Sequence, residues 1–295
     1  MALHAATRGS ELARRQARHV ASLLDQEVEE VVVETTGDRH RDAPIWEIGG
    51  RGVFVKEVQA AVLEGRADFA VHSAKDLPAR PTPGLVLAAV PERGDARDAM
   101  VGSTLDDLPP GALVGTGAVR RRAQLASMRP DLTFASVRGN VDTRLRKATD
   151  YGAVVVAAAA LRRLERIEVA AELFDPELFV PQVAQGALAV ECREGDERVL
   201  DAIATIDHAP SRRAVEAERA YLAELGGGCD LPVGAHARVV DGAVRLAAVL
   251  ATLDGHIVLR ATTQGDDPVQ VGRSAAAEIL HESGGTWVLE GASRT

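Results

Sequence analysis

One stretch of the sequence combines residue types that could act on a charged intermediate. Residues 72–78 read HSAKDLP and follow an apolar run, 67–71, that predicts a short buried strand. Lys75 and Asp76 then fall on the turn beyond the carboxyl end of that strand, which is the edge where ligands bind in open α/β sheets. There, Asp76 could orient an N–H donor and stabilise a cation developing on it, while Lys75 could hold an anion. Taken alone, the stretch could equally be a solvated turn.

Arginines occur at three predicted strand-to-helix turns, where the helix dipole disfavours a cation. The arginines concerned are Arg8, Arg120, Arg121, Arg138 and Arg144. A bound anion would neutralise them there, and forked guanidinium groups suit carboxylates or phosphates. Because a helix turns by about 100° per residue, residues 120–122 cannot all share one face. Of the three, Arg120 and Arg121 are predicted to bind the anion. Any one of these arginines alone could be a solvated charge.

The two cysteines occupy different kinds of sequence. Cys229 follows three glycines at 226–228, which predicts accessible backbone, although these glycines could simply end a helix. Cys192 ends an apolar run at 187–192, which predicts a buried thiol. Cys229 could be a nucleophile, an attachment point or an incidental exposed thiol. The spacing predicts neither a disulfide framework nor a metal site.

Composition limits the class of protein. The 295 residues carry a net charge of −9, from 34 basic and 43 acidic side chains. This balance argues against a partner that is nucleic acid or an anionic membrane, because either would require a basic surface. The sequence shows no signal-peptide pattern and no apolar run of about 20 residues. We therefore expect a soluble, cytoplasmic protein.

Apolar runs and turn residues alternate in a manner typical of a parallel α/β fold. Strands are expected at 3–7, 31–35, 67–71 and 85–90, with helices from Ser10 to about 24 and over 54–65. After a break at 91–95, strands are expected at 98–101, 112–114, 133–137, 154–158 and 187–192. Ser10 and Asn140 have the residue types of helix N-caps.

The last third of the chain favours a small α+β unit. A helix at 211–225 is followed by strands at 235–240, 244–252 and 257–262, which are joined by Asp-Gly pairs typical of hairpins, and by a helix at 269–281. The strand at 187–192 is expected to return to the first unit, giving a two-way crossover. The predicted domains are 1–93 with 187–208, then 94–186, then 209–295.

Together these stretches resemble hydroxymethylbilane synthase, also called porphobilinogen deaminase. The matching motifs are ATRGS at 6–10, HSAKDLP at 72–78, RGNVDTRL at 138–145, QGA at 185–187, ECR at 191–193 and GGCDLPVG at 227–234. They cover almost the whole chain in the family's order. The resemblance implies an α/β fold with two periplasmic-binding-protein-like lobes, parallel-dominated mixed sheets and a crossover, plus a small C-terminal α+β domain.

The resemblance also implies a transferase that joins porphobilinogen units head to tail, releasing ammonia, to give hydroxymethylbilane in tetrapyrrole (heme) biosynthesis. A dipyrromethane primer would be held by a thioether to Cys229. Loss of ammonia leaves positive charge on the pyrrole nitrogen, and the resemblance gives Asp76 the role of stabilising it. The residues implied in binding substrate or cofactor are Arg8, Ser10, Arg51, Phe54, Ser73, Lys75, Thr116, Arg120, Arg121, Arg138, Gly139, Arg144 and Gln185. A monomer is expected.

Some positions depart from the family. Gly117 and Ala118 stand where paired hydroxyl residues are common, Ala184 replaces a usual glycine, and Glu47 replaces a frequent lysine. None of these changes falls on Asp76, so they bear on binding and not on the reaction.

Two other functions stay open at this point. A non-catalytic, two-lobed anion-binding protein would account for the arginines and the crossover, but it would need neither Asp76 nor a glycine-flanked Cys229. A thiol enzyme would use Cys229 as a nucleophile in each turnover.

Overall fold

The computed structural model describes residues 2–35, 55–227 and 231–292. The chain forms two compact units, each described here by itself. Unit 1 combines residues 1–94 with 186–212, and unit 2 combines residues 95–185 with 213–295. The chain therefore leaves unit 1 near the predicted break at 91–95 and returns to it next to Gln185.

Unit 1 is built on a five-stranded sheet with the order β2-β1-β3-β10-β4. Its strands are β1 (Leu3–Arg8), β2 (Val28–Val33), β3 (Phe69–Ser73), β4 (Leu85–Ala89) and β10 (Leu188–Arg193). β10 pairs antiparallel with both β3 and β4, so it alone runs opposite to the others. The crossing strand predicted at 187–192 is therefore confirmed as part of the first sheet.

Helices cover both faces of this sheet. They are α1 (Glu11–Leu23), α3 (Lys56–Leu63) and α7 (Glu197–Ala204). Apolar side chains of α1 and α7 pack with one set of strand residues, and those of α3 pack with the alternate set. This division follows from the strand geometry, because successive side chains point to opposite faces. The core is made almost wholly of Ala, Val and Leu, as the scarcity of aromatic residues requires.

Unit 2 contains a second five-stranded sheet with the order β7-β6-β8-β5-β9. Its strands are β5 (Asp98–Val101), β6 (Leu113–Gly115), β7 (Thr133–Ala135), β8 (Ala153–Ala157) and β9 (Ala170–Leu173). Here β5 alone runs opposite to the others. Its helices are α4 (Val119–Met128), α5 (Val141–Arg146) and α6 (Ala158–Arg163). Thus in each sheet the strand next to the chain crossing is the antiparallel one.

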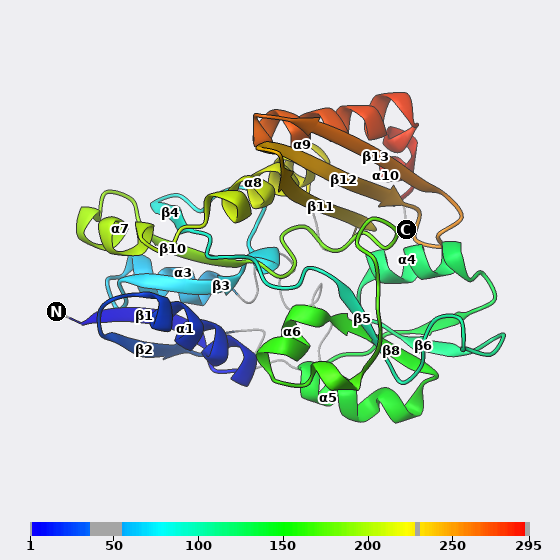
Figure 1. Cartoon of the computed structure of the whole chain (residues 1–295), viewed down its shortest axis with the longest axis horizontal. Helices are drawn as coiled ribbons and strands as arrows, with labels where there is room; N and C mark the ends of the chain where they lie inside the picture. Colours follow the sequence, from blue (N-terminus) through cyan, green and yellow to red (C-terminus); the bar gives the residue numbers. More distant parts are fainter. Residues whose placement is uncertain (1, 36–54, 228–230, 293–295) are drawn as a thin grey trace. The chain divides into compact units, whose positions relative to one another are not determined.

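A three-stranded antiparallel sheet completes unit 2 (Figure 1). Its strands are β11 (Val233–Val240), β12 (Ala243–Ala251) and β13 (Val258–Gly265). Its helices are α9 (Pro268–Ala277), α10 (Gly285–Ala292) and α8 (Ala209–Glu224), whose first four residues belong to unit 1. The first predicted hairpin is confirmed, since Asp241 and Gly242 both have positive φ, 50° and 84°. Gly272 of α9 packs closely on α8, where an added Cβ would lie 2.2 Å from the Ala217 carbonyl oxygen.

The predicted fold class is confirmed in both five-stranded sheets, which are mixed, with four of five strands in one direction. The sequence reasoning missed β9, α6, α7 and α10 and started β2 three residues late. The separation of unit 2 into domains at 94–186 and 209–295 stays a prediction. Within the described ranges, no helix combines the length and apolar character needed to cross a membrane.

Candidate active site

Asp76 lies on a short turn at the carboxyl end of β3, as predicted. The strand ends at Ser73, and a single 3₁₀ turn, Ala74–Asp76, follows. The backbone N–H of Ala74 donates to the Ala187 carbonyl at 3.1 Å, and the N–H of Leu77 closes the turn on Ala74 at 3.3 Å. The Asp76 side chain is half-buried. The carboxylate is therefore carried by a backbone that is fixed on the sheet, and it keeps contact with solvent.

The β1–α1 turn brings a second group of predicted residues to the same edge of the sheet. β1 and β3 are parallel neighbours, so their carboxyl ends meet at one edge. Arg8 is the last residue of β1, and Ser10 caps α1 by accepting a hydrogen bond from the Ala13 N–H at 3.3 Å. Gln16 of α1 donates to the Ser73 hydroxyl at 2.8 Å, which ties this helix to β3. Unit 1 thus gathers Arg8, Ser10, Ser73, Lys75 and Asp76 at one edge.

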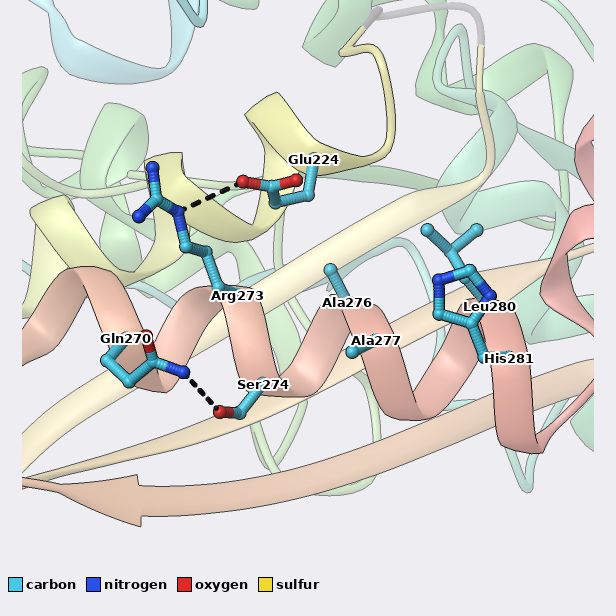
Figure 2. A pocket seen from close by; sticks show the side chains of 8 residues that line it. All are labelled: Glu224, Gln270, Arg273, Ser274, Ala276, Ala277, Leu280 and His281. Atoms are coloured by element: carbon cyan, nitrogen blue, oxygen red, sulfur yellow. Dashed lines mark hydrogen bonds and ion pairs between the residues drawn. The ribbon is translucent and has the colours of Figure 1, made fainter.

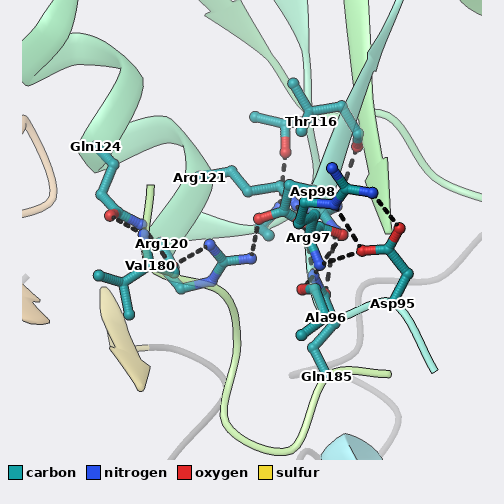
Figure 3. Close-up of polar contacts among 12 residues, drawn as sticks. Asp95, Ala96, Arg97, Asp98, Thr116, Arg120, Arg121, Gln124, Val180 and Gln185 are labelled. Carbon is teal, nitrogen blue, oxygen red and sulfur yellow. Dashed lines mark hydrogen bonds and ion pairs between the residues drawn. The ribbon is translucent and has the colours of Figure 1, made fainter. Parts of the chain in front are cut away.

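In unit 2, Arg120 and Arg121 at the start of α4 converge on the buried carboxylate of Asp98 (Figure 3). Arg120 donates to one carboxylate oxygen at 2.7 Å, and Arg121 donates twice to the other, at 2.7 and 3.0 Å. Gln185 is fully buried, and its amide nitrogen donates to the same oxygen of Asp98 at 2.9 Å. The backbone carbonyl of Val180 accepts another hydrogen bond from Arg120, at 2.6 Å.

This cluster corrects the sequence reasoning about α4. Arg120 and Arg121 are each 4% exposed, and the anion beside them is Asp98 of the chain itself, whereas Arg122 is exposed. Their place at a helix start is therefore no evidence for a ligand. Sequence reasoning missed Asp98, although a charged residue at the head of an apolar strand is a signal that it needs a buried partner. A role of Arg120, Arg121 and Gln185 in binding a ligand rests on the family resemblance.

The electrostatics of the cluster still favour one more anion. Burial alone would raise the pKa of Asp98, but attraction to Arg120 and then to Arg121 outweighs it and holds that pKa well below its usual range. Two guanidinium groups against one carboxylate leave a net positive charge. The buried Nε atom of Arg120 makes no hydrogen bond within the described part of the chain. The site therefore suits the carboxylates that a dipyrromethane carries.

The turns after β6 and β7 hold the remaining predicted residues of unit 2 that the structure describes. Asn140 caps α5 by accepting from the Thr143 N–H at 2.9 Å, and Arg144 donates to the Gly139 carbonyl at 3.0 Å. Gly139 has a φ of +105°, and a Cβ there would lie 2.7 Å from the Thr143 side chain, so glycine is required. Thr116 follows β6, the parallel neighbour of β7, and its hydroxyl accepts from the Ala118 N–H at 3.3 Å.

Three predicted site residues, Arg51, Phe54 and Cys229, lie outside the described residues. The other cysteine is described: Cys192 is fully buried in β10, as predicted, and burial raises the pKa of its thiol to about 11. Ala184, which precedes Gln185, has a φ of 59°, a conformation that favours glycine. Ala184 therefore adopts a left-handed backbone conformation that disfavours a side chain with a Cβ.

A hollow of about 280 Å³ lies elsewhere in unit 2, over α8 and α9 (Figure 2). Arg273 pairs with Glu224 across it at 3.1 Å, and Gln270 donates to Ser274 at 3.3 Å. None of the predicted site residues that the structure describes lines it. The hollow therefore has no part in the site described above.

These observations define an α/β protein whose strand ends carry a half-buried carboxylate in one unit and a buried, net-positive arginine cluster in the other. Residues 3–201 match the model of the porphobilinogen deaminase dipyrromethane cofactor-binding domain, and residues 212–281 match that of its C-terminal domain. The chain therefore belongs to the porphobilinogen deaminase family.

Named relatives agree with the family models. The chain is 46% identical to porphobilinogen deaminase of Acidothermus cellulolyticus, over 99% of this chain and 92% of the relative. It is 44% identical to the enzyme of Geobacillus kaustophilus, over 96% and 95% of the two chains. The chain therefore has porphobilinogen deaminase activity and forms hydroxymethylbilane with a dipyrromethane cofactor, in tetrapyrrole biosynthesis. The family membership therefore excludes the two other functions, that of a non-catalytic anion-binding protein and that of a thiol enzyme.

Solved structures give a weaker similarity. A periplasmic binding protein of Salmonella typhimurium with high arginine specificity matches with a TM-score of 0.36 and 14% identity, over 70% of this chain and 91% of that one. The GluR0 ligand-binding core of Nostoc punctiforme matches with a TM-score of 0.34 and 14% identity, over 68% and 91%. At these scores the match carries no weight for function.

Proposed function

We propose that Asp76 is the catalytic group of this porphobilinogen deaminase and that Cys229 carries the dipyrromethane through a thioether. The observation that supports Asp76 most directly is its half-buried position on a fixed turn, at the same sheet edge as Arg8 and Lys75. When the carbon–nitrogen bond of porphobilinogen breaks and ammonia leaves, positive charge spreads onto the pyrrole nitrogen. The Asp76 carboxylate accepts a hydrogen bond from that N–H and stabilises the charge.

The remaining residues bind the carboxylates and orient the pyrroles. Each pyrrole carries an acetate and a propionate, so a growing chain needs several cations and donors. The residues proposed for this are Arg8, Ser10, Arg51, Phe54, Ser73, Lys75, Thr116, Arg120, Arg121, Arg138, Gly139, Arg144 and Gln185. When bound, the dipyrromethane supplies the pyrrole end to which the first substrate unit is joined. The net positive charge of Arg120 and Arg121 around Asp98 supports the binding of one carboxylate of the dipyrromethane there.

Substitution of Arg138 tests the binding role. Arg138→Leu is expected to lower turnover by about tenfold to a hundredfold, because a charge-assisted hydrogen bond contributes about 1.5–3 kcal/mol. The mass of the purified variant should correspond to apoprotein or to enzyme stalled with pyrroles attached. The matched control is Arg122→Leu, since Arg122 is exposed, and it should keep the normal mass and turnover. If Arg138→Leu behaves like the control, Arg138 is a solvated surface charge.

A cytoplasmic location and a monomeric state also stay proposals, and both rest on the sequence alone.

A further inference from the structure

Four polar side chains of unit 1, three of them buried, contact one another in a row. His72 of β3 and Glu191 of β10 lie on neighbouring antiparallel strands, with His72 Nε2 at 3.1 Å from Glu191 Oε2. Gln59 of α3 donates from Nε2 to the same oxygen at 2.8 Å. The Thr82 hydroxyl then donates to Gln59 Oε1 at 3.0 Å. We call these four residues the polar clamp.

Three of the four residues of the polar clamp are buried, and Thr82 is half-buried. Gln59 is 4% exposed, and His72 and Glu191 are each 6% exposed. The contact of His72 Nε2 with Glu191 makes no hydrogen bond of good geometry, so the hydrogen-bonded path runs from Glu191 through Gln59 to Thr82. A buried carboxylate is seldom more stabilising than an apolar side chain of equal size, because desolvation offsets the attraction. What such a network provides is a fixed orientation of the segments that it joins.

The segment that the polar clamp joins is the one that carries Asp76. His72 lies four residues before Asp76 in β3, and Thr82 lies six residues after it. The hydrogen bonds of the polar clamp therefore join Thr82, which follows Asp76, to α3 and β10, while His72, which precedes Asp76, contacts Glu191 without a hydrogen bond. Its path passes through α3 and β10, which are both packed in the core of unit 1. The backbone before Asp76 is thus held by the pairing of β3 with β10, and the backbone after it is held at Thr82 by Gln59.

We propose that the polar clamp is a positioning device, and that Thr82 and Gln59 hold the Asp76 turn in its productive place. The proposal rests on Asp76 being the catalytic group. Under this proposal, the catalytic rate depends on Thr82 and Gln59 as well as on Asp76, although neither is proposed to contact the substrate. A carboxylate that must meet a pyrrole N–H at hydrogen-bond distance loses rate steeply when its backbone shifts by about 1 Å.

Thr82 is the residue with which to test the proposal. Thr82→Val keeps the shape of the side chain and removes the hydroxyl, and Thr82 is only half-buried, so the variant is expected to fold. We expect kcat to fall by about tenfold while KM changes by less than about twofold. Thr82→Ser restores the hydroxyl and should recover most of kcat. Gln59→Met removes both hydrogen bonds and should lower kcat further.

A matched control separates positioning from loss of stability. The Thr263 hydroxyl in unit 2 donates to the Val271 carbonyl at 2.9 Å and is also half-buried, so Thr263→Val loses a comparable hydrogen bond. Both variants should show small and similar shifts in melting temperature, and Thr263→Val should keep its kcat. Equal kcat values for Thr82→Val and the unmodified chain would overturn the proposal.

A double-mutant cycle of Thr82→Val and Asp76→Asn separates the positioning role of the polar clamp from the catalytic role of Asp76. If the polar clamp acts through Asp76, Thr82→Val should cost little further rate in the Asp76→Asn background. A full tenfold loss in that background would overturn the positioning role. If Asp76→Asn itself turns over normally, the catalytic assignment is wrong, whatever Thr82 does. If Asp76→Asn is slow and Thr82→Val is normal, only the proposal about the polar clamp is wrong.

Discussion

Asp76→Asn is expected to turn over porphobilinogen at least about a hundredfold more slowly than the unmodified chain, with little change in fold. The amide keeps the shape of the side chain and loses the charge, so the cation that forms as ammonia leaves is no longer stabilised. Losing such an electrostatic interaction costs about 3 kcal/mol or more of transition-state stabilisation. Steady-state kcat on the variant, with a melting curve to verify folding, is the measurement.

The matched control for this variant is Asp25→Asn, because Asp25 is an exposed carboxylate of unit 1. It should keep both kcat and melting temperature. Since the Asp76 turn is held by backbone hydrogen bonds of Ala74 and Leu77, the substitution should not unfold unit 1. A kcat for Asp76→Asn close to that of the control would remove Asp76 from the catalytic role.

Asp98→Asn is expected to lower the free energy of unfolding by about 3–5 kcal/mol, because it leaves two buried guanidinium groups without a counter-ion. Asp98 is fully buried, and it accepts hydrogen bonds from Arg120, Arg121 and Gln185. Urea denaturation compares the variant with Asp131→Asn, which breaks a solvent-screened pair with Arg129 and should lower the stability far less. Equal midpoints for the two variants would show that the cluster is solvated.

The pH dependence gives a second test of Asp98. Its folded pKa is held below the unfolded value of about 4, so the carboxylate stabilises the fold above that pH. This stability is lost as the pH falls from about 4 towards the folded pKa. Asp98→Asn has no such group, and its stability should depend less on pH in that acid range than that of the unmodified chain.

The local parts of the fold follow from the sequence because short-range chemistry decides them. Ser10 and Asn140 have side chains that can accept a backbone N–H, and both cap helices. The Asp241–Gly242 pair accepts positive φ and makes the predicted hairpin. Apolar runs predicted most of the strands, and Asp76 lies on the turn after β3 that the sequence predicted.

Contacts between distant residues were not predictable in the same way. Asp98 meets Arg121 across 23 residues, and Gln59 meets Glu191 across 132. Nothing in the local pattern states which arginine is buried or which acid it meets, so the pairing of Arg120 and Arg121 with Asp98 could not be predicted. Short, weakly apolar elements such as β9 were missed because their periodicity is too brief to separate a strand from a loop.

A dipyrromethane bound covalently to Cys229 can be detected directly, because the bond adds its mass to the protein. A thioether survives denaturation, and reductants do not remove it as they would remove a disulfide-linked adduct. Cys229→Ser should lose the attachment and most activity. Cys192→Ser should keep both, because the Cys192 thiol is buried in β10.

The direct test is the mass of the denatured, unmodified chain purified from cells that make porphobilinogen. We expect a mass greater than that of the sequence by one dipyrromethane, with the increment on the peptide that contains Cys229. An active protein with the bare mass of the sequence would contradict it.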